Sequence, residues 1–180
     1  MDRPAKVLVF LVVGVLGPAW SIGVASGAVI LNELMAANSN SSADPQGEFD
    51  DWVELYNTSD SPVNVAGLYL TDDPTTPTKW QIPTSVPNMT QIPAKGYLII
   101  WLDNDTTDSG LHASFKLDAA GDQIALFDAD GTTQLDLVAF QDQQTDISYG
   151  RSSTGADSWC HMIRATPGTL NTTAYQGVVA

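Results

Sequence analysis

Asp51-Trp52-Val53-Glu54-Leu55-Tyr56-Asn57 is the stretch of sequence that decides the fold of this chain. Its residues alternate with a period of two, so Val53 and Leu55 point to one face while Trp52, Glu54 and Tyr56 point to the other. This period is typical of a β-strand with one face on a hydrophobic core. The stretch therefore predicts a strand at residues 51–57 with Val53 and Leu55 inside.

Similar short apolar runs follow along the chain, separated by turn residues such as Ser61-Pro62, Asp73-Pro74 and Asp130-Gly131. The predicted strands are residues 29–35, 51–57, 67–71, 79–82, 97–102, 112–117, 123–127, 135–140 and 147–151. No window carries a convincing helical stripe, so the sequence predicts an all-β sandwich of eight or nine short strands. The side chains predicted to lie between its two sheets are Val53, Leu55, Leu98, Ile100, Leu126 and Leu137.

The N-terminal segment has the order of a secretory signal peptide. Arg3 and Lys6 supply positive charge, an uncharged apolar run occupies residues 7–16, and small residues stand at 25–28. An uncleaved membrane anchor is the alternative, which Gly17-Pro18 disfavours. We expect cleavage on export to the cell surface or medium, and no later apolar run approaches the length of a membrane span.

The predicted organisation is a signal peptide at 1–28, one domain at 29–171 and a flexible tail at 172–180. The full chain has 21 acidic and 7 basic residues, so removal of Asp2, Arg3 and Lys6 leaves 20 and 5, a net charge of −15. Nucleic acid affinity rests on lysine and arginine, so no nucleic acid partner is expected. The only cysteine, Cys160, cannot form an internal disulfide; pairing between chains and simple burial stay open.

Short motifs recur in a fixed order between residues 29 and 171. They are Leu31-Asn32-Glu33-Leu34-Met35-Ala36, Asp51 to Asn57, Ser61 to Asp73, Ile92-Pro93-Ala94-Lys95-Gly96-Tyr97-Leu98, Phe115-Lys116-Leu117, Ser148-Tyr149-Gly150-Arg151 and Ala165-Thr166-Pro167-Gly168-Thr169-Leu170-Asn171. Together they resemble the lamin-tail domain of exported bacterial proteins. The resemblance implies an immunoglobulin-like sandwich, in agreement with the strand pattern.

The resemblance implies less about function. Lamin-tail domains of nuclear lamins follow a coiled-coil rod and contact chromatin and membrane proteins, whereas this sequence has few basic residues and a signal-like segment in place of a rod. In exported bacterial proteins the domain accompanies hydrolases as an accessory module, and these 180 residues hold no such catalytic partner. A nuclear role is therefore not expected.

Candidates for catalysis are few. A nucleophilic triad or a zinc site draws on His and Cys, and the sequence offers only His112, His161 and Cys160. We expect His112 to be a half-exposed structural residue at the start of a strand. Glu33 and Glu54 lie inside predicted strands, and a carboxylate-based hydrolase needs two such acids about 5–10 Å apart. We expect both glutamates to point to solvent, because buried glutamate is rare.

Acidic loops give the best chemical hypothesis, because carboxylates are the ligands that Ca²⁺ prefers. Three clusters qualify: Asp44-Glu48-Asp50-Asp51, Asp72-Asp73 and Asp103-Asp105-Asp108. The preferred metal site joins the loop before Trp52 to the second cluster through Glu48, Asp50, Asp51, Asp72 and Asp73. Turn capping, a surface suited to high salt and solvated loops without metal are the alternatives. Asp128-Ala129-Asp130-Gly131 opens like an EF-hand loop but lacks its spacing, so a hairpin turn is expected there.

The sequence as a whole predicts an exported, non-catalytic adhesion or interaction module, stabilised by calcium, with an extracellular or cell-surface protein or polysaccharide as partner. Trp52, Trp80 and Trp101 are candidates for sugar stacking, although packing in the core is the expected role of each. The alternative is an extracellular hydrolase that uses paired carboxylates on a polysaccharide or another polymer. A cleft lined by two buried acids would favour the hydrolase, and acids confined to the rim would favour the module.

Overall fold

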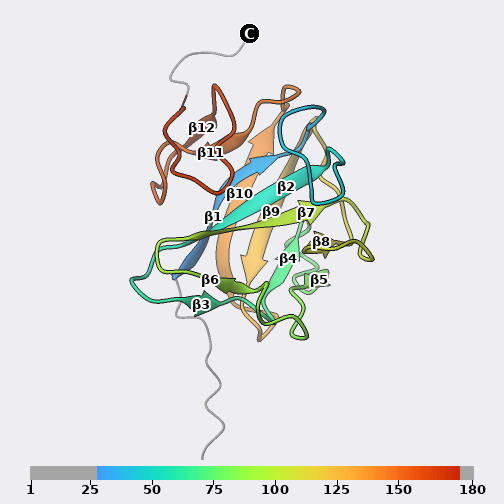
Figure 1. Cartoon of the computed structure of the whole chain (residues 1–180), viewed down its shortest axis with the longest axis vertical. Helices are drawn as coiled ribbons and strands as arrows, with labels where there is room; N and C mark the ends of the chain where they lie inside the picture. The colour runs from blue at the N-terminus through green and yellow to red at the C-terminus, as the bar shows by residue number, and fades with distance from the viewer. Residues whose placement is uncertain (1–27, 175–180) are drawn as a thin grey trace, which may run out of the picture.

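The computed structural model describes residues 28–174, so the predicted signal peptide up to residue 27 and residues 175–180 of the predicted tail lie outside the described residues. All regular elements of the described part are β-strands (Figure 1), which confirms the all-β prediction. The strands are β1 (Val29–Met35), β2 (Asp51–Asn57), β3 (Val63–Asn64), β4 (Tyr69–Thr71), β5 (Trp80–Gln81), β6 (Gln91–Ile92), β7 (Tyr97–Leu102), β8 (His112–Ala113), β9 (Gly121–Phe127), β10 (Gln134–Gln141), β11 (Tyr149–Arg151) and β12 (Trp159–His161). Nine of them fall on the predicted runs, and β3, β6 and β12 come in addition. Among residues 28–174 no helix is long and apolar enough to cross a membrane.

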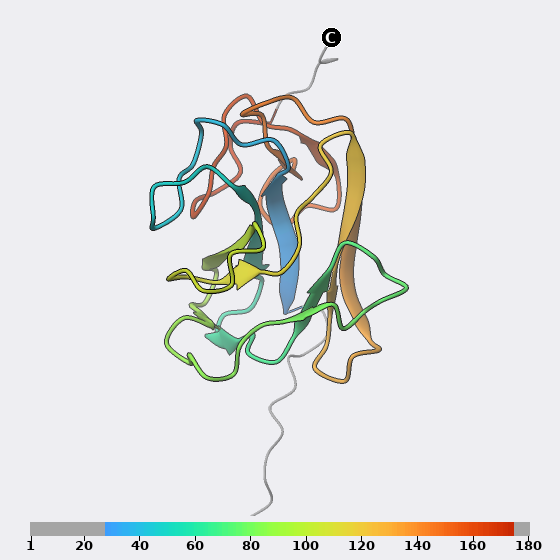
Figure 2. The same ribbon diagram turned by 90° about the vertical axis from the view of Figure 1, so that its right-hand side faces the viewer.

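The strands form two main layers. One sheet has the order β12-β11-β1-β2-β7-β8 and the other the order β10-β9-β4-β5, while β3 and β6 pair separately. Neighbours in the two large sheets are antiparallel except β7 and β8, which are parallel. Figure 2 shows the long β9–β10 hairpin as a layer of its own beside β1. The arrangement is an immunoglobulin-like β-sandwich.

The core lies between these layers. Val53, Leu55, Ile100 and Leu126 are fully buried in it, which confirms their predicted place. Leu98 packs against the core but is only half-buried. The prediction for Leu137 is wrong, because this side chain is 40% exposed. Its neighbours in β10, Val138 and Phe140, point inward instead, and the run Leu135 to Phe140 contains apolar residues on both faces, so alternation alone did not decide which set is buried.

A β-bulge in β1 reverses the alternation of that strand. Leu31 pairs with Leu55, and the next pair is Glu33 with Glu54, so Asn32 is the extra residue between them. As a result Leu31 and Leu34 both point into the core although they are three residues apart. The bulge also places Glu33 opposite Glu54, on the outer face of the sheet.

This outer face is covered by protein. Trp52, Trp101 and Met35 form a second small cluster there, and Ala165, from the segment after β12, packs against it. The same segment extends to the Met162–Ala174 bridge, where the described chain ends. Trp80 is buried in the main core, so the expectation of core packing holds for all three candidate tryptophans.

Candidate functional site

Two connections of the six-stranded sheet meet at one end of the sandwich. The last residue of β7 pairs with the first residue of β2, so the β7–β8 connection leaves the sheet beside the β1–β2 connection at residues 36–50. The two connections are joined directly, because Gln46 Nε2 donates hydrogen bonds to the carbonyl oxygen and the hydroxyl of Ser109, both at 3.1 Å. All groups of three or more potential metal ligands that the described residues form lie at this end of the molecule.

Six carboxylates and one imidazole converge there in three overlapping triplets. In each triplet one potential ligand atom per residue lies within 4.8 Å of the others. We call these residues the acidic cluster; the triplets are Asp44–Asp103–His112, Asp44–Glu48–Asp50 and Glu48–Asp105–Asp108. Among residues 28–174, the ion pairs that involve the cluster are those of His112 with Asp103 and of Lys116 with Asp50, the latter at 3.9 Å. Two basic groups thus face six acids.

Asp44 is the shared centre of two triplets and is only 7% exposed. Its Oδ1 accepts hydrogen bonds from the backbone N–H groups of Gln46 and Glu48, at 2.9 and 2.7 Å. Its Oδ2 is buried without a hydrogen-bond partner among the described residues. A buried carboxylate oxygen is costly to leave unpaired, so this atom is an unusual feature of the cluster.

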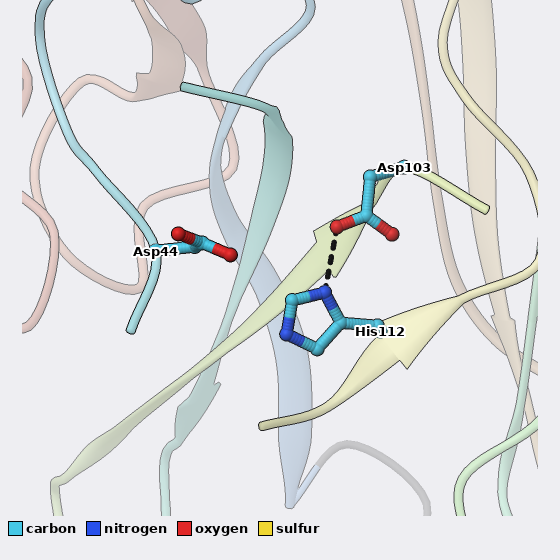
Figure 3. A group of neighbouring side chains, drawn as sticks. All are labelled: Asp44, Asp103 and His112. Atoms are coloured by element: carbon cyan, nitrogen blue, oxygen red, sulfur yellow. Dashed lines mark hydrogen bonds and ion pairs between the residues drawn. The ribbon is translucent and has the colours of Figure 1, made fainter. Parts of the chain in front are cut away.

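His112 and Asp103 form a buried pair beside Asp44 (Figure 3). His112 Nδ1 lies 2.6 Å from Asp103 Oδ2, and the two side chains are 1% and 3% exposed. Burial acts to lower the pKa of His112, but the hydrogen bond and the charge of Asp103 outweigh it, so the pKa lies above its ordinary value. The expectation of a half-exposed His112 is therefore wrong. The connection from β7 folds over the ring, which the strand pattern alone did not indicate.

Two acids of the cluster have raised pKa values. For Glu48 the causes are desolvation and then the negative charges of neighbouring acids, Asp50 and Asp44 first. For Asp50 desolvation comes first and the charge of Asp103 second, while the charge of Lys116 acts in the opposite direction. Like charges held this close destabilise one another, so a cation among them would be favoured.

The structure divides the five predicted metal ligands. Glu48 and Asp50 belong to the acidic cluster. Asp51 lies beside it in sequence, but its Oδ2 accepts a hydrogen bond from the N–H of Leu117 at 3.1 Å, and burial raises its pKa to about 6. No ligand triplet of the described residues contains Asp51, Asp72 or Asp73.

Asp72 and Asp73 have other partners, at the end of β4 in the second sheet. Asp72 is paired with Lys79 at 2.5 Å, and Asp73 accepts hydrogen bonds from Thr75 in the following turn. The sequence did name the other members of the cluster, Asp44, Asp103, Asp105 and Asp108, but in separate groups, because their convergence depends on which strands are neighbours. His112 was not among the expected metal ligands.

The expected hairpin at Asp128 to Gly131 is present between β9 and β10. Asp130 accepts hydrogen bonds from the hydroxyl of Thr133 and from the N–H groups of Thr133 and Thr132, and these lower its pKa to about 2. Gly131 has a φ of 70°, a conformation that glycine adopts without strain.

Glu33 and Glu54 form a second group of acids, in the sheet itself. Both are 0% exposed, so the prediction that they point to solvent is wrong. Glu33 accepts hydrogen bonds from the hydroxyl of Ser148 at 2.5 Å and from Thr166, through its N–H at 3.0 Å and its hydroxyl at 2.6 Å. Desolvation raises its pKa, and these hydrogen bonds only partly offset the rise.

Both carboxylate oxygens of Glu54 also accept hydrogen bonds. Asn32 Nδ2 donates to its Oε1 at 2.8 Å, and the N–H of Gly168 donates to its Oε2 at 2.5 Å. Desolvation raises the pKa of Glu54 to about 8, with a smaller contribution from the charge of Glu33. The two acids are thus buried beneath the segment after β12 and are not exposed in a cleft. An open hollow elsewhere, lined by residues 120–123 and 139–141, contains neither of them.

Comparison with known proteins agrees with this architecture. The lamin tail domain family matches residues 24–142, about two thirds of the chain, and β11 and β12 complete the first sheet beyond the matched range. No curated protein and no solved structure matches the chain. The family match and the immunoglobulin-like sandwich agree with the motifs found in the sequence. The chain belongs to the lamin tail domain family.

Proposed function

We propose that this protein is an exported, non-catalytic adhesion or interaction module that binds an extracellular or cell-surface partner. The observation that carries the proposal is the state of Glu33 and Glu54, the two acids best placed for hydrolysis. Both are completely buried, and every oxygen of the pair accepts a hydrogen bond from the protein. A lamin tail domain is an interaction-type β-sandwich, which agrees with a binding role.

This geometry gives little support to the alternative function, a hydrolase. A glycosidase pair must reach both sides of a bond in a bound polymer. Here the segment that carries Thr166 and Gly168 would first have to leave the sheet, which would break the hydrogen bonds to Glu33 and Glu54. The two glutamates therefore support a role in holding that segment in place.

A protein partner is favoured over a polysaccharide. The three tryptophans considered for sugar stacking, Trp52, Trp80 and Trp101, are all buried. The surface is instead dominated by acids, since the chain after the predicted cleavage site has a net charge of −15. Such a surface suits a basic protein patch and disfavours nucleic acid. The proposal includes calcium as a stabilising ion, which the acidic cluster supports.

Export is tested by the N-terminus of the protein recovered from cells that secrete it. A mature chain that begins near residue 28 supports export, and a retained Met1 in the membrane fraction contradicts it. Partner binding is tested by immobilising the chain from residue 28 and exposing it to envelope, extracellular and cytosolic fractions, in EDTA and in calcium. We expect capture of a discrete protein from the first two fractions. Hydrolysis of a polymer by the purified chain, abolished by Glu54→Gln, would contradict the proposal.

A further inference from the structure

The hydrogen bonds of Asp44 account for only one of its two carboxylate oxygens. Its Oδ1 is used by the backbone of the loop, at Gln46 and Glu48, and this alone explains why an aspartate stands there. Its Oδ2 is buried and has no hydrogen-bond partner among the described residues. Figure 3 shows that one carboxylate oxygen of Asp44 points toward His112 and Asp103, into the space between the two connections.

The surroundings of Asp44 have the dimensions of a cation site. Ligand atoms of Asp44, Glu48 and Asp50 lie within 4.8 Å of one another. Calcium binds oxygens at about 2.3–2.6 Å, so ligands on opposite sides of one ion are separated by about 5 Å. Three oxygens this close together can therefore share one calcium ion.

The donor set favours calcium over a transition metal. The three carboxylates supply only oxygen, whereas zinc and related ions prefer imidazole or thiolate. His112 is poorly placed as a ligand, because Nδ1 is bound to Asp103 and Nε2 lies 3.4 Å from the carbonyl oxygen of Ser109. A Cβ atom at Gly110 would lie 2.8 Å from Nε2, so the loop packs closely on that nitrogen.

We propose that Asp44, Glu48 and Asp50 bind one calcium ion, with Oδ2 of Asp44 as the buried ligand. The His112–Asp103 pair borders the site and holds the β7–β8 connection against it. The ion neutralises acids that the two neighbouring basic groups do not balance and holds residues 44–50 of the β1–β2 connection together. This inference deepens the calcium part of the proposed function and rests on that part alone, because it requires no partner.

The test uses the purified protein and calcium chloride as the probe. Isothermal titration calorimetry is expected to show one bound ion per chain. Melting curves are expected to shift upward by several degrees at about a hundredfold excess of calcium over its Kd, relative to EDTA. Magnesium is expected to bind at least about tenfold more weakly, because it needs a smaller octahedral shell and releases water reluctantly. Sodium chloride at matched ionic strength controls for screening.

Asp44→Asn is the decisive variant, because its remaining oxygen can still accept the two backbone hydrogen bonds. It is expected to weaken calcium binding by at least about tenfold. Removal of a residue that only supports a metal ligand already costs this much, and Asp44 is itself a ligand in the proposed site. Glu48→Gln changes an exposed side chain, so it preserves the fold and is expected to weaken binding in the same direction. The matched control is Asp72→Asn with Asp73→Asn, which removes two acids outside the cluster and is expected to leave the Kd unchanged.

Three results would overturn the site. The first is coincident melting curves in EDTA and calcium together with no calorimetric signal. The second is calcium affinity that Asp44→Asn and Glu48→Gln leave unchanged, whatever the Asp72, Asp73 double variant does. The third is equal affinity for magnesium and calcium. Failure of the partner capture in the previous section would leave this ion-binding result untouched, so the two proposals fail separately.

Discussion

Glu54 makes the stability of this domain depend on pH in a direction opposite to that of an ordinary ion-paired carboxylate. Its pKa rises from the ordinary value of 4.5 to about 8 in the folded protein, first because it is desolvated. Between these values the folded protein holds a proton that the unfolded chain has released. Stability from this group is therefore fully present below pH 4.5 and is lost as the pH rises toward 8.

The size of the effect follows from the two pKa values. At about 1.4 kcal/mol for each pH unit, the interval from 4.5 to about 8 corresponds to a loss of about 5 kcal/mol. This is a large share of the roughly 5–15 kcal/mol that holds a typical domain together. Asp51, whose pKa is raised to about 6 mainly by burial, and His112, whose pKa is raised by Asp103 against the opposing effect of burial, act with the same sign. Asp130, with a lowered pKa of about 2, acts only below this range.

The assay is urea unfolding followed by tryptophan fluorescence at several pH values from 4.5 to 9, for the wild type and for Glu54→Gln. The variant loses one acceptor for Asn32 or Gly168, so we expect it to be about 1–3 kcal/mol less stable at pH 4.5. Because glutamine does not ionise, the variant is expected to lose much less stability than the wild type as the pH rises. Asp157→Asn, on the surface and outside both groups of acids, is the control and should keep the wild-type slope. Parallel profiles for the wild type and Glu54→Gln, or a wild type that gains stability from pH 5 to 8, would refute the reasoning.

The other predictions concern packing. Leu55→Ala should lower the free energy of unfolding by about 2–5 kcal/mol, whereas Leu137→Ala should change it by no more than about 0.5 kcal/mol; equal effects would contradict the assignment of the two faces of the sandwich. Gly150→Ala should cost about 1–3 kcal/mol in the same denaturation assay, because the new Cβ would lie 2.7 Å from Cε of Met162 and 3.0 Å from Cγ of Glu33; a neutral change would mean that both side chains move aside freely.

The candidate cation site could be predicted from the sequence only in part. The excess of aspartate in loops favoured carboxylate ligands, and two of the predicted ligands, Glu48 and Asp50, lie in the acidic cluster. Asp72 and Asp73, which the sequence joined to them, follow β4 in the other sheet and share no ligand triplet with them among the described residues. Their neighbours in the acidic cluster are Asp44, from the same connection, and acids of the β7–β8 connection. The pairing of β2 with β7, across the intervening β3 to β6, brings the two connections together.

The sequence by itself determined the all-β class, the positions of nine strands and the hairpin at Asp130-Gly131, because period two and turn chemistry are local properties. It also determined which face of β2 carries Val53 and Leu55. Only the tertiary structure decided which alternate residues of β10 face the core, where β1 has its bulge (at Asn32), and that Glu33 and Glu54 are buried. The physical reason is that burial of a strand's second face depends on what is packed over it. Here the cover comes from the segment after β12, which lies far along the chain, so no local pattern in β1 or β2 records its presence.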